Sequence, residues 1–123
     1  GGVRGPAEEE QSPDPDIRLQ ATLHTQRIAQ YATTLTAFDA DIAAIQAAIR
    51  TAEGDRASLT DQLTVSQDVE RLRQELFDAQ TGSRLLLLDA RSARLRTERE
   101  LQSVINRLSE LGHQLNSRQA ERQ

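Results

Sequence analysis

The sequence predicts an all-α fold, in the form of a long antiparallel two-helix coiled-coil hairpin. Proline is confined to positions 6, 13 and 15, so the rest of the 123-residue chain contains no strong helix breaker. One tyrosine, two phenylalanines and no tryptophan supply too little aromatic volume for an ordinary globular core. Apolar residues instead recur at seven-residue intervals on both sides of Gly82, as they do in coiled coils.

The first helix is expected over residues 16–78. Residues 1–15 combine glycine, proline and acidic residues without apolar periodicity, which predicts a flexible lead-in. Asp14 suits the N-cap of the helix that follows, and Pro15 suits its first turn. Gly54 is the one candidate break, but the seven-residue register passes through it and favours a continuous helix.

Residues 79–83 are predicted to form the tip of the hairpin, and residues 84–122 the second helix. Gly82 tolerates the left-handed backbone conformation that often ends a helix, and Ser83 is a good N-cap for the next one. A connection this short makes the two helices antiparallel neighbours.

The interface between the helices, called the seam below, is predicted from apolar residues that pair across the tip. Residue numbers rise along the first helix as they fall along the second, so Ile49 faces Leu115 and Leu63 faces Leu101. The stripe is expected to slip by one position in each helix, after Leu63 and before Leu101. The predicted seam residues are Ile49, Leu59, Leu63, Val69, Leu88, Leu95, Leu101, Ile105 and Leu115.

Charged residues near the tip fit the same pairing, which sets Glu70 opposite Arg94 and Asp68 opposite Arg96. Exposed pairs of this kind are worth only about 0.5 kcal/mol each, so they select the register more than they stabilise it.

The two predicted helices are unequal in length. The pairing sets Gln123 opposite Asp41, so the amphipathic stretch from Ile17 to Asp41 has no partner within the chain. Such a stretch is not expected to stay exposed to water. It could pair with a second chain, fold back, or meet partner sequence that lies outside this chain. We favour the last explanation and expect the chain to be a fragment of a larger protein.

Several kinds of function are disfavoured by composition. The net charge of −4 and the lack of a contiguous basic face argue against nucleic acid as a partner. His24 and His113 are far apart and cysteine is absent, so no metal site or other cofactor is expected. No catalytic constellation is recognisable, and the chain is not expected to be an enzyme. No apolar run approaches a membrane span, so this segment is not expected to contact a membrane directly.

Four consecutive leucines, residues 85–88, follow the predicted tip. A two-stranded seam can bury only one or two of them. The others either cover the turn and pack in an oligomer contact, or form a docking surface for partner helices at the end of the rod.

The tip sequence carries a family resemblance. The stretch from Glu75 to Leu88, followed by Arg91, Leu95, Glu98 and Leu101, resembles the hairpin tip of hemolysin D-type membrane fusion proteins, the periplasmic adaptors of type I secretion systems. The family's tip pattern has an arginine, a leucine four residues later and a serine seven residues beyond that. Leu76 and Ser83 match the last two positions. Leu72 stands at the arginine position, flanked by Arg71 and Arg73.

The resemblance implies a periplasmic hairpin that links an inner-membrane ABC exporter to a TolC-type outer-membrane channel, with the parent protein anchored in the inner membrane. It further implies side-by-side packing with neighbouring adaptor protomers and docking of the channel at the tip. The partner-binding residues implied at the tip are Leu72, Arg73, Leu76, Gly82, Ser83 and Arg84.

Two other functions are weighed against this one. In the first, the chain is a purely structural coiled-coil spacer or dimerisation module, and the tip has no partner. In the second, the leucine-rich tip is a membrane wedge, which the mixed flanking charges and the absence of tryptophan disfavour.

Overall fold

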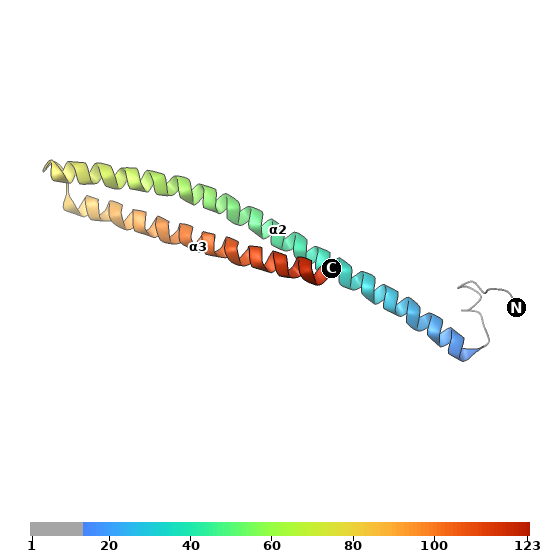
Figure 1. Ribbon diagram of the computed structural model, residues 1–123. Helices are drawn as coiled ribbons and strands as arrows, with labels where there is room; N and C mark the ends of the chain where they lie inside the picture. The colour runs from blue at the N-terminus through green and yellow to red at the C-terminus, as the bar shows by residue number, and fades with distance from the viewer. Residues whose placement is uncertain (1–13) are drawn as a thin grey trace.

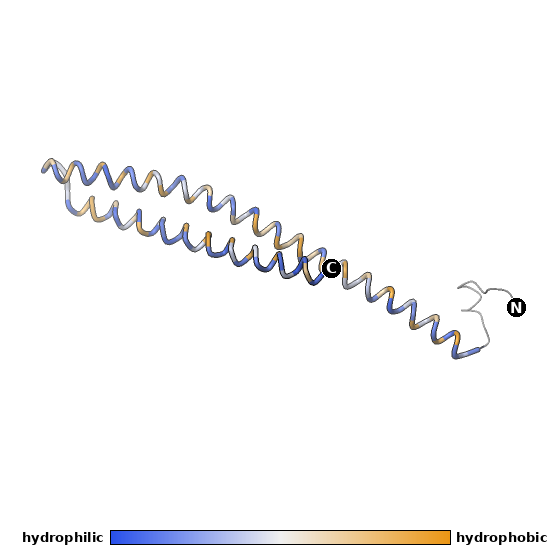
Figure 2. The backbone as a smooth tube through the Cα atoms, in the orientation of Figure 1, coloured by the Kyte–Doolittle hydropathy of each residue, from blue (hydrophilic) through white to orange (hydrophobic). Residues whose placement is uncertain are grey.

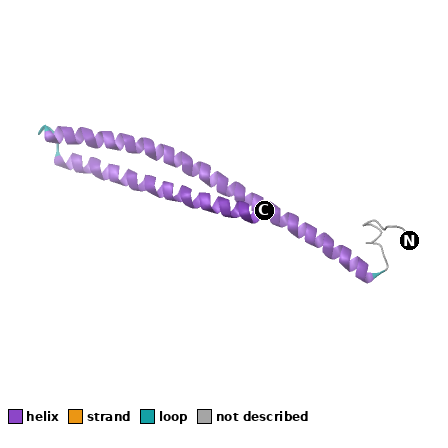
Figure 3. Ribbon diagram, viewed as in Figure 1, coloured by secondary structure: helices purple, strands orange, loops and turns teal. Residues whose placement is uncertain are grey.

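The computed structural model describes residues 14–123, which form two long helices joined by a short turn (Figure 1). Helix α2 spans Pro15–Asp78 and helix α3 spans Arg84–Arg122. Figure 3 shows helix throughout the described residues, with loop only at the helix ends and the tip. The all-α hairpin is confirmed, and both helices begin and end within one residue of the predicted bounds. The predicted lead-in lies, up to residue 13, outside the described residues.

Helix α2 is a single 64-residue helix that runs without a break through Gly54. The Asp14 side chain caps its start by accepting a hydrogen bond from the Asp16 backbone N–H at 3.0 Å, and Pro15 fills the first position. A methyl group added at Gly54 would meet no atom within 4 Å. Gly54 therefore lies on an open face of a continuous helix, as the unbroken register predicts.

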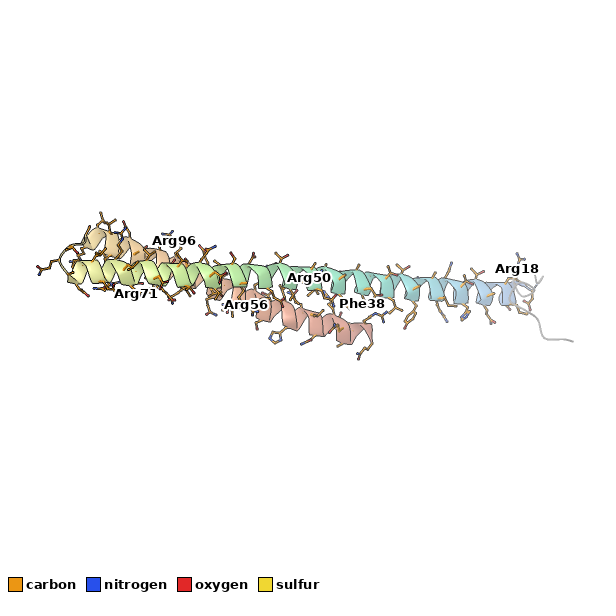
Figure 4. The ribbon with its side chains drawn as sticks, turned by 90° about the horizontal axis from the view of Figure 1, so that it is seen from above. Arg18, Phe38, Arg50, Arg56, Arg71 and Arg96 are labelled. Carbon is orange, nitrogen blue, oxygen red and sulfur yellow. The ribbon has the colours of Figure 1, made fainter. Side chains whose placement is uncertain are left out.

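The two helices lie antiparallel and wrap gently around each other. Viewed from above, α3 lies on one side of α2 near the tip and on the other side near its own C-terminal end (Figure 4). Such a crossing is expected of helices that keep a seven-residue apolar repeat against each other. Because α3 is the shorter helix, α2 continues well past its end (Figure 1).

The observed seam keeps one unbroken heptad pattern in each helix, with buried or half-buried residues alternately three and four positions apart. In α3 these are Leu87, Ala90, Arg94, Thr97, Leu101, Val104, Leu108, Leu111 and Leu115. In α2 they are Ile42, Ile45, Ile49, Ala52, Leu59, Leu63, Ser66, Glu70 and Arg73, with the exposed Arg56 filling the one gap.

The predicted slips are therefore wrong, although much of the predicted seam is right. Ile49, Leu59, Leu63, Leu101 and Leu115 are half-buried at seam positions. Four other predicted seam residues face solvent instead: Val69, Leu88, Leu95 and Ile105, which are 42%, 42%, 52% and 39% exposed. Each lies one helical position away from a true seam residue.

The reason for this difference is that charged residues occupy the seam near the tip. Glu70 and Arg94 lie at seam positions and pair with each other across the two helices. A slip would place Val69 and Leu95 in the seam, but it would require the helices to change their winding. Because Glu70 and Arg94 satisfy each other, the heptad phase continues and the aliphatic neighbours stay outside.

The register at the open end of the hairpin also differs from the prediction. Asp41 was expected opposite Gln123, but Arg118 lies beside it, with 3.9 Å between Nε and Oδ2. Arg122 donates from Nε to Oδ1 of Asp39 at 2.5 Å. The expected pairing of Asp68 with Arg96 is also wrong, because Asp68 pairs with Arg71 of the same helix, at 3.6 Å.

Candidate functional site: the hairpin tip

The turn at the tip is held by backbone hydrogen bonds at the end of α2. The Gln80 N–H donates to the Phe77 carbonyl at 3.0 Å, and the Thr81 N–H donates to the Leu76 carbonyl at 2.9 Å. This pair of bonds is the Schellman arrangement that closes many helices. The Thr81 hydroxyl adds a third bond to the Leu76 carbonyl at 3.1 Å. The Leu76 and Phe77 carbonyls near the end of α2 are thus satisfied within the turn itself.

Gly82 has a different role from the predicted one. The left-handed residue of the turn is Gln80, with φ of 59°, and no glycine among the described residues has positive φ. A Cβ atom built at Gly82 would lie 2.8 Å from the Cβ of Leu76, closer than side chains tolerate. Gly82 is needed because the chain passes tightly over Leu76.

Ser83 is the N-cap of α3, as predicted. Its hydroxyl oxygen accepts a hydrogen bond from the Leu86 N–H at 3.4 Å, and its backbone is extended. Ser83 and Arg84 are both exposed, and Arg84 is the first residue of α3. The serine that matches the family pattern therefore faces solvent while it fixes the start of the second helix.

The leucines around the turn lie mostly outside the seam. Of residues 85–88 only Leu87 is buried, at 4% exposure, while Leu85 is 67% exposed. Leu72 and Leu76 of α2 are 51% and 43% exposed. The tip therefore presents aliphatic side chains from both helices to solvent.

The arginines that flank Leu72 lie in different environments. Arg73 occupies a seam position and is half-buried between the helices. The Arg71 side chain is 62% exposed and pairs within its own helix with Asp68 and, at 3.3 Å, with Glu75. Figure 4 labels Arg71 and Arg96 on opposite sides of the hairpin. Of the two arginines beside Leu72, Arg71 is the more accessible to a partner.

Behind the tip, Glu70 is the centre of a charged network. Its carboxylate accepts from Arg94 and, at 3.4 Å, from Arg91, while Arg94 also bonds Glu98 at 3.0 Å. The hydrogen bond from Arg94 is the largest cause of the lowered pKa of Glu70; burial opposes it, and the charge of Arg94 and the hydrogen bond and charge of Arg91 add to the lowering. The hydrogen bond to Glu70 raises the pKa of Arg94. These pairs join α2 to α3 where the seam lacks aliphatic side chains.

Residues 14–123 contain no group of three histidine, cysteine or acidic side chains placed to hold a metal ion. Within the same residues, no helix is long and apolar enough to cross a membrane. A shallow groove near the open end is lined by Asp41, Ala44, Ile45, His113, Gln114, Ser117 and Arg118.

Comparison with known proteins gives no match to a family model, a curated protein or a solved structure.

Five of the six predicted tip residues are exposed at or near the turn: Leu72, Leu76, Gly82, Ser83 and Arg84. The sixth, Arg73, lies in the seam and is half-buried. Sequence reasoning missed the special conformation of Gln80, for which glutamine gives no signal. It also missed the bond from Thr81 to Leu76, although a threonine five residues after a helical leucine is a possible closing residue.

Proposed function

We propose that this chain is the helical hairpin of a hemolysin D-type periplasmic adaptor, which links an inner-membrane ABC exporter to a TolC-type outer-membrane channel for protein secretion. Its role is mechanical and requires no catalytic group. The observation that carries the proposal is the tip, where solvent-facing Leu72, Leu76 and Leu85 surround a turn locked by hydrogen bonds. Apolar side chains fixed at the end of a rod suit docking onto the helical end of another protein.

The tip residues have separable roles in this proposal. Leu76 and Ser83, the two matches to the family pattern, would contact the channel helices. Arg71 is the better candidate for the arginine role, because its side chain is exposed whereas Arg73 is half-buried. Gly82 would act indirectly, because it allows the tight passage of the chain over Leu76.

Two aliphatic stripes outside the seam support packing against neighbouring adaptor protomers. On α2 the stripe contains Val65, Val69, Leu72 and Leu76, all exposed and spaced four, three and four residues apart. On α3 it contains Leu88 and Leu95. The α2 residues Val69 and Leu72 each precede a seam residue, and the α3 residues Leu88 and Leu95 each follow one. The two stripes therefore lie on opposite faces of the antiparallel hairpin. A hairpin with two such faces can contact a neighbour on each side.

The test uses the N-cap chemistry of Ser83. Ser83→Asp keeps a capping side chain and adds a negative charge, whereas Ser83→Asn keeps the cap without charge, so the two variants form a matched pair. We expect a TolC-type channel from the same organism to capture the wild type and Ser83→Asn equally. The amount of Ser83→Asp captured should be at least tenfold lower. Equal capture of both variants, or no capture of the wild type even after crosslinking, would contradict the proposal.

A structural coiled-coil module is the second candidate. The observation that favours it is the part of α2 that extends past α3 with apolar side chains exposed (Figure 1). If the chain is such a module, substitutions at the tip do not change the binding of any partner. Only seam substitutions such as Leu63→Asp then disrupt the packing of the helices.

A further inference from the structure

The segment of α2 that extends past α3, residues 15–38, is called the overhang here. It is as helical as the rest of α2, but several of its apolar side chains face solvent. Ile28 is 58% exposed and Tyr31 is 67% exposed. Figure 2 shows that apolar residues keep recurring along this part of the helix.

The overhang continues the seam in the same heptad phase. Residues spaced alternately four and three positions apart form one line along α2, from its first turn to the interface with α3. The residues on this line are Ile17, Ala21, His24, Ile28, Tyr31, Leu35 and Phe38, followed by the seam residue Ile42. The surface that α3 covers between Ile42 and the tip therefore extends along the overhang as one continuous stripe.

The overhang is poorly suited to remain a single helix in water. Threonine is an unfavourable helix former, and most helical stability in proteins comes from packing of an apolar face rather than from intrinsic propensity. Five threonine hydroxyls bond back to the carbonyl four residues earlier at 2.9–3.0 Å, those of Thr22, Thr25, Thr33, Thr34 and Thr36. Packing against another helix is the stabilisation that such a segment requires.

We propose that the overhang binds the overhang of a second copy of this chain, antiparallel and related by a two-fold axis near Gln26. Helix α3 runs antiparallel to α2, and the copy's overhang would extend α3 along the same stripe in the same direction. The interface is therefore a continuation of one that the structure already contains. A two-fold contact also covers both overhangs along their full length, since each is the partner of the other.

The end of α3 selects one register. Heptad phase allows registers that differ by seven residues. When His24 faces Ile28 of the second copy, Asp14 of the copy lies beside Phe38, just beyond the end of α3 at Arg122 (Figure 4 labels Phe38 near that end). A shift of seven residues toward the tip would make the copy overlap with α3. A shift of seven residues away from the tip would leave Leu35 and Phe38 uncovered.

The helix-dipole ends at the junction between the copies are complementary. The overhang begins with Asp14 and Asp16 at a helix N-terminus, and α3 ends with Arg118 and Arg122 near a helix C-terminus, where these arginines already pair with Asp41, Glu121 and Asp39. The proposed register brings a helix N-terminus and a helix C-terminus together, so their dipole ends are opposite in sign. One contact opposes association, because Arg27 would lie near Arg27 of the second copy beside the axis.

This inference does not rest on the function proposed for the tip, and it describes a different assembly. The resulting rod carries one tip at each end, whereas adaptor hairpins packed side by side point all their tips at one channel. The same stripe would also fit a helix that extends α3 in a longer chain, and such a helix would exclude the dimer. The experiment below uses the 123-residue chain and needs no channel, so its failure is distinct from failure of the docking proposal.

Cysteine substitution tests the geometry cleanly, since the chain has no cysteine. His24→Cys and Ile28→Cys chains are oxidised separately and as a mixture, and the dimers are resolved by mass. We expect the mixed His24→Cys–Ile28→Cys disulfide to exceed either same-variant disulfide several-fold. Gln26→Cys, which points away from the stripe, is the matched control and should form little disulfide. Same-variant disulfides that dominate would indicate a parallel pair and would overturn the proposal.

Sedimentation of the unmodified chain gives the second readout. We expect a dimer at micromolar concentration, tighter dimerisation with Arg27→Gln, and a monomer with reduced helix content with Ile28→Asp. A monomeric wild type at high concentration would overturn the proposal, as would a dimer that Ile28→Asp leaves intact.

Discussion

Glu70 and Arg94 pair with each other from seam positions of opposite helices, at a level where a two-stranded coiled coil ordinarily carries aliphatic side chains. The aliphatic residues that sequence periodicity would put there, Val69 and Leu95, lie one position away and face solvent. At the level of this pair, the hairpin thus carries charge between its helices and aliphatic side chains outside the seam.

Replacing both partners of this pair should raise stability, whereas removing one should lower it. Leucine at both positions, in the double variant Glu70→Leu/Arg94→Leu, exchanges a half-buried ion pair for aliphatic packing. Glu70→Ala alone leaves the Arg94 guanidinium without its cross-helix acceptor. Thermal unfolding followed by circular dichroism should show a higher Tm for the double variant and a lower Tm for Glu70→Ala. A double variant less stable than Glu70→Ala would show that the pair is stabilising in itself.

The lowered pKa of Glu70 makes the near-tip pairing sensitive to acid. A carboxyl group whose pKa is lower in the folded state contributes stability above its unfolded pKa, and this contribution is lost as pH falls through its folded pKa. The wild type should therefore lose Tm below about pH 4. Glu70→Gln should show a smaller loss over the same range, measured at constant ionic strength. Identical pH profiles for the two proteins would contradict this role of Glu70.

Leu111 and Leu95 distinguish the observed seam from the one predicted by periodicity alone. Leu111 is 7% exposed, whereas Leu95 is 52% exposed. Leu111→Ala should lower the free energy of unfolding by about 2 kcal/mol. Leu95→Ala should change it by less than about 0.5 kcal/mol. Urea titrations of the two variants give the comparison, and similar losses would favour a seam that includes Leu95.

The turn offers a test in which glycine is gained at one position and lost at another. Gln80→Gly relieves the left-handed conformation and should stabilise the hairpin by about 0.5 kcal/mol. Gly82→Ala places a methyl group against Leu76 and should destabilise it by about 1–3 kcal/mol. Both values come from denaturant unfolding. The reverse order of stability would restore Gly82 as the left-handed residue of the turn.

The helices, the tip position and the antiparallel arrangement could all be predicted from the sequence, because they depend on proline placement, capping residues and heptad spacing. The phase of the seam near the tip could not. Counting apolar residues there favours Val69 and Leu95, but packing keeps a constant helix winding and admits Glu70 and Arg94 because each satisfies the other. The distinct environments of Arg71 and Arg73 follow from that phase.

The role of Gly82 was beyond sequence reasoning for another reason. A glycine after a helix suggests positive φ, and only the three-dimensional path of the turn shows that the constraint is its close approach to Leu76. The left-handed conformation falls instead on Gln80, a residue with no special tendency toward it.

Helix α2 is one uninterrupted element from Pro15 to Asp78, about 95 Å long at 1.5 Å per residue. Because the helix has no break between these ends, a partner that holds the overhang also constrains the orientation of Leu76 and of the turn beside it. The direction in which the tip faces is therefore set at the far end of the molecule, and whatever grips the base of α2 also aims the tip.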